Sequence, residues 1–407
     1  MIHDISINGV RSLKGLELKF CPGITVVHGP NGCGKTTLLE CIHLLGQGFS
    51  FRAKDLKELI AWKADELIVR GNFEDVDGLQ AGQSRRRAVR IHRRGNEVKE
   101  NGENLKSLSG LFGGCPAVIM QPSDIELLRG APEVRRHWLD EILCYRSSAN
   151  TEILRRYKRV LQQRNQWLKQ YKKNCAMKGD VTGNASGSLA ENAVGGEDLF
   201  LVLTRQLVEL GAKLWAARLD LALEISPVIT HYYGTLSGGV DEITCSYKSS
   251  ILKELDSMDD SCFMDEEDSV AESLAGNAMM DESDLREAFA NKLQRLERAE
   301  RAMGMTLAGP HRDDLALCIG GFEMRSVGSQ GQCRSAALAM RFAAVDVACR
   351  YLSKPILLLD DIFAELDGNR RNAVAGLIRE KQCQVVIATP QKEDLPFTAD
   401  AEIQLTL

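Results

Sequence analysis

The sequence lacks paired cysteines. Its twelve cysteines are scattered singly between Cys21 and Cys383, and no two of them have the C-x-x-C spacing. This distribution argues against a zinc site and against a redox pair, and it is typical of a chain kept in a reducing compartment. Each cysteine is expected to be a small, buried, apolar side chain.

Long apolar runs are also missing. No stretch approaches the roughly 20 apolar residues that a membrane-spanning helix needs, and Asp4, Asn8 and Arg11 interrupt any signal-peptide core at the N-terminus. We therefore expect a cytoplasmic protein without a membrane partner. The composition, 44% hydrophobic and 26% charged over 407 residues, is that of a globular chain with enough apolar material for a sizeable core.

An excess of positive charge is absent, because the formal net charge is −5. The charge is unevenly distributed, however. Residues 254–284 contain twelve acidic side chains and no lysine or arginine, so the rest of the chain has a formal charge of +7. A basic body with one acidic insert is compatible with contact to a polyanion. The insert itself is predicted to be disordered or a solvated insertion.

A phosphate-binding pattern is present near the N-terminus. A short β-branched run, Ile24–His28, precedes it, and residues 37–45 after it have helical spacing. Between them, Gly29-Pro30-Asn31-Gly32-Cys33-Gly34-Lys35-Thr36 matches G-x-x-x-x-G-K-[ST] in full. Glycines let backbone N–H groups converge on phosphate oxygens, and the helix N-terminus adds positive charge. We predict that Lys35 contacts the β- and γ-phosphates of ATP, that Thr36 binds Mg²⁺, and that Thr37 belongs to the nucleotide site.

A second pattern lies near the C-terminus. Residues 356–359 are fully apolar, as in a buried parallel strand, and Asp360 and Asp361 follow directly. We predict that Asp360 binds Mg²⁺, directly or through water, and that Asp361 orients or deprotonates the attacking water. The alternative is an acidic strand end that only caps a turn, which a P-loop elsewhere in the chain disfavours.

A third pattern, Ser329-Gln330-Gly331-Gln332, shortly precedes a predicted helix over 335–349. A hydroxyl, a glycine and a helix N-terminus together form a second anion site. One nucleotide rarely needs two such sites in one chain, whereas two chains packed head-to-tail would use one of each per ATP. The alternative is a polar turn that caps the helix.

The sequence pattern predicts two α/β parts separated by a helical region. Residues 1–145 and 304–407 alternate strands and helices, and 146–303 are predicted to form a helical arm subdomain. Within it, two long helices, the second running from about 197 to about 223, would pack antiparallel around a flexible loop over 174–196. A further helix is predicted over 284–302.

Together, these motifs resemble those of an ABC-type ATPase, with S-x-G-Q as the signature, Asp360-Asp361 as Walker B, and Glu365-Leu366-Asp367 as the D-loop. The helical insertion resembles the SMC branch, and within it the chain is similar to the RecF family. Asn31–Arg52, Pro122–Asp140 and Gly309–Asp314 support that similarity, and Tyr157 with Gln163–Asn165 also fits. The resemblance covers nearly the whole chain and implies a two-lobed ABC-type ATPase head with mixed and parallel sheets.

The resemblance also implies roles for individual residues. Arg11 would approach the nucleotide phosphates, Gln121 takes the place of the Q-loop residue that senses magnesium, and Asp367 would act across a dimer. Thr389 takes the place of the switch histidine of transporters. ATP would lie between two protomers, with Lys35 and Asp360 from one chain and Ser329, Gly331 and Gln332 from the other; Lys35, Asp361 and Ser329 would be catalytic.

The task implied by the family is recombinational DNA repair. An ATP-dependent homodimer would bind duplex DNA at the border of a single-stranded gap and hydrolyse ATP slowly, with stimulation by DNA. With RecO and RecR it would help to place RecA on single-stranded DNA in gap repair, replication and the SOS response. An ABC transporter ATPase subunit, which would lack the arm, and a DNA scaffold that binds ATP without needing turnover remain alternatives.

Two basic stretches are candidate DNA contacts, a hairpin over Arg85–Arg94 and a helix over Arg155–Lys173. Each could equally be a solvated face. The cluster His311–Asp314 permits a metal-binding interpretation, but a structural role or support of the nucleotide site is favoured.

Overall fold

The structure is a computed structural model that describes residues 1–75, 82–179, 190–239, 241–249, 251, 281–392 and 395–406. These residues form two compact units. Unit 1 comprises Met1–Leu128, His231–Asp241 and Ser329–Leu407, and unit 2 comprises Arg129–Thr230 and Glu242–Gly328. The domain boundaries predicted after residues 145 and 303 differ from the limits of these two units, and they stay predictions.

Unit 1 contains two sheets. An antiparallel sheet has the order β2-β1-β4-β5-β6-β7, and a parallel sheet has the order β14-β3-β13-β12-β8. The strands of the first are β1 (Ile2–Asn8), β2 (Leu16–Lys19), β4 (Glu66–Glu74), β5 (Ser84–His92), β6 (Gly95–Glu100) and β7 (Glu103–Asn104). Those of the second are β3 (Ile24–His28), β8 (Ala117–Met120), β12 (Ile356–Asp360), β13 (Val385–Thr389) and β14 (Ala401–Gln404).

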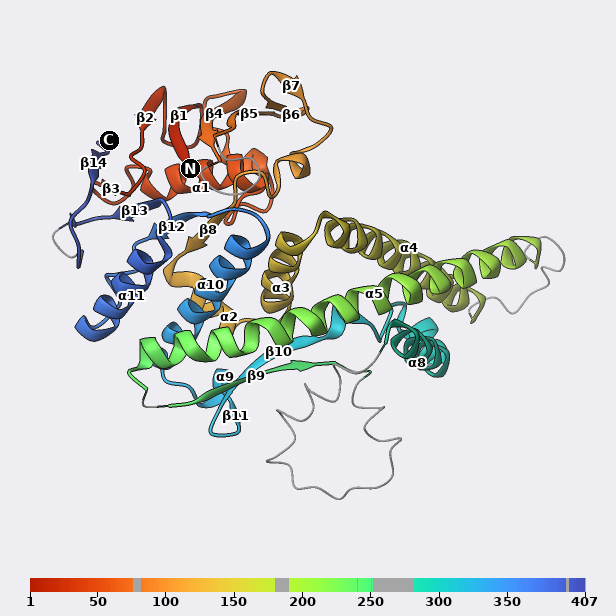
Figure 1. The fold of residues 1–407 in the computed structure, drawn as a ribbon. Coiled ribbons are helices and arrows are strands. Elements are labelled where there is room, and N and C mark those ends of the chain that lie inside the picture. Colours follow the sequence, from red (N-terminus) through yellow and green to blue (C-terminus); the bar gives the residue numbers. More distant parts are fainter. Residues whose placement is uncertain are drawn as a thin grey trace. The chain divides into compact units, whose positions relative to one another are not determined.

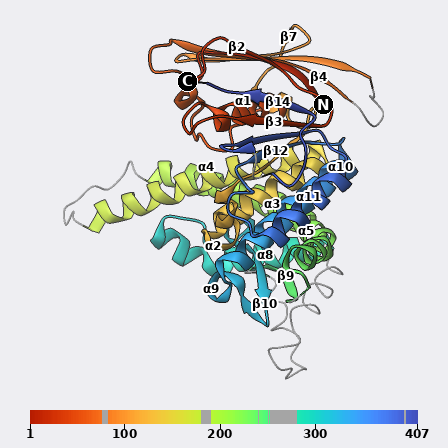
Figure 2. The same ribbon diagram turned by 90° about the vertical axis from the view of Figure 1, so that its left-hand side faces the viewer.

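Helices cover the parallel sheet and explain its apolar strands. Helix α1 (Lys35–Gln47) lies between the two sheets of unit 1, and nearly all of its residues are buried (Figure 2). Helices α10 (Gln330–Tyr351) and α11 (Gly368–Lys381) pack on the other face (Figure 1). Since both faces of the sheet are covered, β12 and β13 are buried along almost their whole length. The buried parallel strand predicted over 356–359 is confirmed.

Short helical elements complete unit 1. They are η1 (Leu56–Leu59), η2 (Leu108–Leu111) and η3 (Pro122–Ile125), with α2 (Glu126–Arg129) at the boundary to unit 2.

Unit 2 is built mainly from helices. It contains α3 (Pro132–Arg146), α4 (Ser148–Gly179), most of α5 (Ala190–Ser237) and α8 (Glu282–Met303). A small antiparallel sheet has the order β11-β10-β9, from β9 (Ile243–Lys248), β10 (Asp314–Ile319) and β11 (Phe322–Glu323), flanked by η4 (Pro310–Arg312) and α9 (Met324–Val327). Helices α4 and α5 run antiparallel, because Arg164 contacts Thr204 while Trp167 stacks on Phe200.

The helices of unit 2 are longer than predicted. Residues 174–179 continue α4 and residues 190–196 belong to α5, so the loop predicted over 174–196 is too wide; its centre, 180–189, lies outside the described residues. Once a helix is held by packing, further residues extend it at low cost. Helix α5 also continues past Pro227 to Ser237, because Ile225, Ile229 and Tyr233 bury its inner face.

The acidic insert is also shorter than predicted at its C-terminal end. Asp281 caps the N-terminus of α8 by accepting hydrogen bonds from the backbone of Ser283 and Asp284, so 281–284 are ordered helix start rather than insert. Carboxylates are favourable at a helix N-terminus, which explains this part of the charge run. The disorder predicted for 254–280 falls on residues that lie outside the described ones.

In the described parts of the chain, no helix combines the length and apolar character needed to cross a membrane.

Candidate nucleotide site

The loop between β3 and α1 has the geometry of a phosphate cradle. Gly34 caps α1 in a left-handed conformation, with φ of 102°, and a Cβ added there would lie 2.5 Å from Leu13 Cδ2. Gly32, with φ of 87°, also lies in the left-handed region, and a Cβ there would meet open space. The backbone can therefore turn tightly before α1, and the first N–H groups of α1 have no acceptor within the helix.

Lys35 lies over this loop. Its Nζ donates to the carbonyl oxygens of Gly29 at 2.7 Å and Pro30 at 3.0 Å, and the side chain is largely buried. Its described contacts are with neutral carbonyls rather than with a carboxylate. Within the described residues the Lys35 ammonium forms no ion pair at salt-bridge distance, which suits it to an anionic ligand.

Thr36 and Asp360 come together from opposite ends of the sequence. Strands β3, β13 and β12 are adjacent and parallel, so their carboxyl ends lie on one edge of the sheet. There the Thr36 hydroxyl donates to Asp360 Oδ1 at 3.1 Å. Burial raises the pKa of Asp360, and the negative charge of Asp361 adds to this, whereas the Thr36 hydrogen bond and the charges of Arg52 and Lys35 lower it.

The pair Thr36–Asp360 fits a magnesium ion. Magnesium prefers hard oxygen ligands and usually takes one or two protein ligands together with phosphates and water. A hydroxyl and a partly desolvated carboxylate in direct contact provide two such ligands beside the phosphate cradle. A cation there would also offset the cost of burying the Asp360 charge.

Asp361 has an unusual backbone conformation. Its φ is 53°, in the left-handed region that non-glycine residues seldom adopt, and its N–H donates to Ala388 O at 2.9 Å. The chain therefore turns sharply as β12 ends, while the backbone stays tied to β13. Such conformations cluster at functional sites, and this one lies where the water-activating residue is predicted.

Gln121 and Thr389 lie at the same edge. Met120 is paired with Leu359, so Gln121 directly follows β8 beside the strand that ends in Asp360. The Gln121 backbone N–H donates to Asp124 Oδ2 at 2.9 Å, whereas Thr389 ends β13 and donates to Gln391 O. The predicted metal role of Gln121 and the role of Thr389 stay predictions.

Arg11 forms an ion pair with a buried residue, Glu40, for which the sequence predicts no role. Arg11 Nη1 lies 3.0 Å from Glu40 Oε2, and Glu40 on α1 is fully buried. Ser50 also donates to Glu40. Glu40 thus holds the Arg11 guanidinium, and its signal in the sequence is an acidic residue between the apolar pairs Leu38-Leu39 and Cys41-Ile42.

The predicted signature residues cap α10. Ser329 Oγ accepts from the Gln332 N–H at 3.2 Å, and Gln332 Oε1 accepts from the Ser329 N–H at 2.8 Å. Gln332 Nε2 also donates to Asp241 Oδ2 at 2.8 Å. These are the contacts that the simpler alternative, a helix cap, requires. They are compatible with a nucleotide role, which stays a prediction for Ser329, Gly331 and Gln332.

Two arginines connect the signature residues with the predicted D-loop. Arg370 pairs with Asp367 at 2.8 Å and approaches Gly331 so closely that a Cβ there would lie 2.8 Å from its Nη1. Arg334 pairs with Glu365 at 2.7 Å. Hydrogen bonds from the Arg370 backbone, and then the Arg370 charge, lower the pKa of exposed Asp367, which therefore stays ionised. The two motifs form one polar surface in unit 1.

The basic hairpin is less available to DNA than its sequence suggests. Arg87 is buried and donates to Glu100 and to carbonyl oxygens of α1, Arg85 pairs with Glu100, and Arg90 pairs with Glu66. Of the arginines predicted to form this patch, Arg87 is therefore excluded by burial, whereas Arg86, Arg90, Arg93 and Arg94 are exposed, with Arg90 already paired to Glu66.

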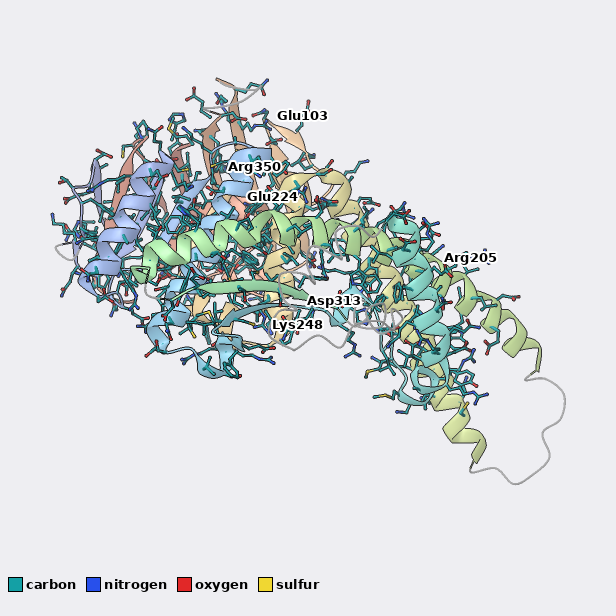
Figure 3. All side chains as sticks on the ribbon, turned by 60° about the horizontal axis from the view of Figure 1, so that its bottom comes forward. Glu103, Arg205, Glu224, Lys248, Asp313 and Arg350 are labelled. Atoms are coloured by element: carbon teal, nitrogen blue, oxygen red, sulfur yellow. The ribbon has the colours of Figure 1, made fainter. Side chains whose placement is uncertain are left out.

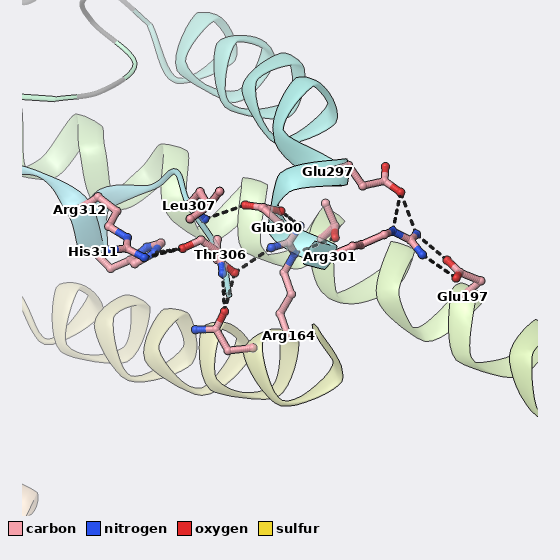
Figure 4. A network of polar contacts seen from close by, with 11 residues as sticks. Arg164, Glu197, Glu297, Glu300, Arg301, Thr306, Leu307, His311 and Arg312 are labelled. Atoms are coloured by element: carbon pink, nitrogen blue, oxygen red, sulfur yellow. Dashed lines mark hydrogen bonds and ion pairs between the residues drawn. The ribbon is translucent and has the colours of Figure 1, made fainter. Parts of the chain in front are cut away.

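The basic helix contains a buried structural arginine as well. Arg164 is buried and donates to Glu300 at 2.6 Å, to Thr306 at 2.7 Å and to Thr204 at 3.0 Å (Figure 4). Arg155 pairs with Glu152 one turn away. Lys158 is exposed but pairs with Asp140. The other exposed cations of α4 stay candidates for contact with DNA; they are Arg156, Arg159, Lys169, Lys172 and Lys173.

The contacts of His311–Asp314 favour the structural role. His311 Nδ1 is hydrogen-bonded to the Tyr157 hydroxyl at 2.7 Å, and Arg135 holds Asp314 through two bonds of 2.7 and 2.8 Å. Asp313 lies beside α5, next to the start of β10, and accepts hydrogen bonds from Trp215 and Tyr247 (Figure 3). Among the described residues, no group of three or more histidine, cysteine and carboxylate side chains could hold a metal ion.

Known proteins resemble this chain over nearly its whole length. The family model described as RecF/RecN/SMC N terminal domain matches residues 1–406. The DNA replication and repair protein RecF of Geobacter sulfurreducens is 32% identical over 389 residues, which cover 95% of this chain and 92% of that protein.

Two solved structures extend the similarity to the fold. The recombination mediator protein RecF-ATPrS in the RecFOR pathway matches with a TM-score of 0.80 and 26% identity, covering 100% of this chain and 96% of that one. The corresponding RecF-ATP structure matches with a TM-score of 0.79 and 25% identity, covering 99% and 95%. The ATPase head fold predicted from the sequence is therefore confirmed.

Proposed function

The chain belongs to the RecF family, and on that basis we propose that it is an ATP-dependent DNA-binding protein of recombinational repair. The observation that supports this most strongly is the contact between Thr36 and Asp360, because it joins a complete phosphate loop to an acidic strand end. A pair of this kind is the minimum that a magnesium–nucleotide site requires.

The chemistry we propose is slow ATP hydrolysis. Magnesium, when bound by Thr36 and Asp360, would neutralise charge on the β- and γ-phosphates. Lys35 would exchange its carbonyl contacts for phosphate oxygens. Asp361 would orient the attacking water and accept its proton.

The functional state we propose is a homodimer held by ATP. Ser329 and Asp367 cap the helices α10 and α11, and Arg370 connects their two motifs into one surface. Such a surface suits the γ-phosphate bound by a second chain. ATP would then stabilise the paired state by binding it more tightly than the separated chains, and hydrolysis would release it.

The partners we propose are duplex DNA at the border of a single-stranded gap, with RecO and RecR as protein partners in placing RecA. The cellular setting would be cytoplasmic gap repair, replication and the SOS response. Relatives described as DNA replication and repair proteins and as a recombination mediator in the RecFOR pathway support this assignment. DNA would stimulate ATP turnover by favouring the paired state.

The test is ATPase rate per protomer against protein concentration, with and without gapped duplex DNA. Lys35→Arg provides the blank. We expect the rate to rise with concentration and with DNA. A rate that is flat in both, from a chain that also stays monomeric with ATP, would rule out the dimeric site.

Asp361→Asn separates a cycling switch from a scaffold that only needs to bind ATP. A switch should bind ATP, dimerise and remain trapped on DNA when it cannot hydrolyse. A scaffold should load and release DNA as the unsubstituted chain does. DNA dissociation rates measured with ATP present distinguish these outcomes.

A further inference from the structure

Helix α5 has exposed apolar residues on one of its sides. Leu201 and Val202 are exposed by 61% and 49%. The buried residues of the same turns share another side, because they are three and four positions apart; they are Phe200, Leu203 and Leu207. Phe200 stacks on Trp167, so the buried side faces α4. Leu201 and Val202 therefore lie on a side of α5 that the described part of unit 2 leaves open to solvent.

A charged residue stands at each end of this exposed apolar pair. Asp198 precedes Leu201 by three positions and Val202 by four, and Arg205 follows them by four and three. These spacings place all four residues on one side of the helix. Asp198 and Arg205 are exposed, and neither forms an ion pair within the described residues (Figure 3 labels Arg205). These four residues, acid, apolar, apolar and base, are called the α5 stripe below.

The α5 stripe is complementary to itself. A two-fold axis that crosses the helix midway between Leu201 and Val202 packs two copies of α5 antiparallel. Residues at equal distances on opposite sides of the axis then meet, so Leu201 meets Val202 of the second copy. By the same symmetry Asp198 meets Arg205 of the second copy, and the reciprocal pair forms at the other end. Two ion pairs therefore flank an apolar centre.

A parallel pairing of the same two faces lacks this complementarity. It would place Asp198 opposite Asp198 of the second copy and Arg205 opposite Arg205, and like charges in direct opposition are unfavourable. The charges therefore select the antiparallel orientation. Charged residues beside the apolar seam of a coiled coil set the orientation of its helices in the same way.

The stripe is short, which limits the strength of the contact. Glu209 lies one turn after Arg205, but its carboxylate is 3.3 Å from Arg286 of α8, so it already has a partner inside unit 2. A standard protein interface uses about 20–30 residues a side, far more than the stripe provides. The contact should therefore be weak, forming at high protein concentration or where another contact already holds two chains together.

We propose that the α5 stripe binds the α5 stripe of a second copy of this chain as an antiparallel helix pair. Leu201 and Val202 of both copies form the apolar centre, and Asp198 and Arg205 form the ion pair at each end. None of the four residues belongs to the nucleotide site, so the contact needs no ATP. It is separate from the ATP-held dimer proposed above and does not rest on it.

Charge reversal tests the pairing, with self-association of the full-length chain measured by sedimentation equilibrium without nucleotide. The concentration series extends to about 1 mM, which detects dissociation constants in the millimolar range. Asp198→Arg and Arg205→Asp should each weaken association about ten-fold, the size expected when two exposed ion pairs become like-charge contacts. Both positions are exposed, so the fold should be unaffected, and unchanged urea midpoints check this.

Mixing the two variants gives the sharpest result. In a pair of unlike chains, both arginines of the Asp198→Arg chain meet both aspartates of the Arg205→Asp chain, so association should return to the original strength. The double variant, Asp198→Arg with Arg205→Asp, should also associate like the original chain. A mixture that associates no better than its two components would overturn the proposal, as would an original chain that stays monomeric throughout the series.

Two leucines test the apolar centre. Leu201→Ser should weaken association several-fold, because it removes apolar area that both copies bury. Leu199→Ser is the matched control, since Leu199 is 51% exposed but lies outside the stripe on a neighbouring side of α5. Equal effects of the two substitutions would indicate unspecific apolar association and would rule out the stripe as the binding surface.

Discussion

Charged side chains lie both at the carboxyl edge of the parallel sheet in unit 1 and in the polar network of unit 2. Their partners differ: they are neutral groups at the sheet edge and an opposite charge in the network. At the edge, Lys35 donates to two carbonyl oxygens, and Asp360 accepts from a neutral hydroxyl. In unit 2, Arg164 is buried against Glu300, which also accepts from the Leu307 N–H.

This difference separates residues available to a ligand from residues that hold the fold. A charge with neutral partners can take an ionic ligand without breaking an ion pair. A buried charge that is already paired cannot, because separating it leaves an uncompensated charge in the interior. Substituting a charge that has neutral partners should therefore change activity, whereas substituting a buried, paired charge should change stability.

The largest effect is expected from breaking the buried pair in unit 2. Glu300→Ala should lower the free energy of unfolding by about 3–5 kcal/mol, because it leaves Arg164 buried without its counter-charge. Glu297→Ala is the control: Glu297 is half-exposed, and its partner Arg301 keeps Glu197. The control should cost less than about 1 kcal/mol. Equal urea midpoints for the two variants would contradict the distinction.

The next effect concerns pH and His311. Burial lowers the pKa of His311 to about 4 from an ordinary value of 6.5. The neutral ring therefore contributes stability in full above pH 6.5, and this contribution is lost as the pH falls toward 4; it amounts to about 3 kcal/mol. Asp313 has the opposite pH dependence. Burial raises the pKa of Asp313 to about 6, so the stability that its protonated form contributes is lost as the pH rises from 4 to 6.

His311→Gln isolates the histidine contribution. Glutamine keeps a donor and an acceptor near Tyr157 and Thr306 but does not titrate. The difference in unfolding free energy between the original chain and this variant should shrink as the pH is lowered from 7 to 4. A difference that stays constant over this range would show that His311 does not titrate as described.

At the sheet edge the expected effect is on turnover. Lys35→Ala should lower the ATPase rate by at least about 100-fold, in line with the loss of one preorganised electrostatic contact. It should change stability little, because Lys35 donates only to loop carbonyls among its described contacts. The exposed Lys63→Ala in the same unit is the control. A large loss of stability in Lys35→Ala would place this residue with the structural charges instead.

The smallest effect is expected at the basic hairpin. Arg94→Ala should weaken DNA binding modestly for all sequences and reduce the slope of log affinity against log salt by about one. Arg87→Ala is the informative comparison, because Arg87 is buried and bonded to Glu100 and α1. It should lower stability. A change in salt slope for Arg87→Ala in a folded protein would contradict its structural role.

The sequence predicts the parts of the site that are local and misses those that depend on folding. The P-loop is a contiguous motif, so its strand, turn and helix could be recognised directly, and the buried strand before Asp360 is identified by its continuous apolar run. Glu40 and Arg164 are different, because only their partners, Arg11 and Glu300, distinguish them from surface charges. The expectation that each cysteine is buried is wrong for Cys175 on α4 and Cys349 on α10, which are exposed, because no spacing in the sequence indicates which side of these helices is covered.

The central claim is that each ATP site combines Lys35 of one chain with Ser329 of another, and a mixing experiment tests it most directly. Lys35→Ala and Ser329→Arg should each be inactive alone. In an equal mixture, half of the dimers would be mixed, and each of these would have one intact site, so ATPase activity should recover to roughly a quarter of the original. If the mixture remains as inactive as its two components, although both variants dimerise with ATP, Ser329 does not act on the ATP of its partner.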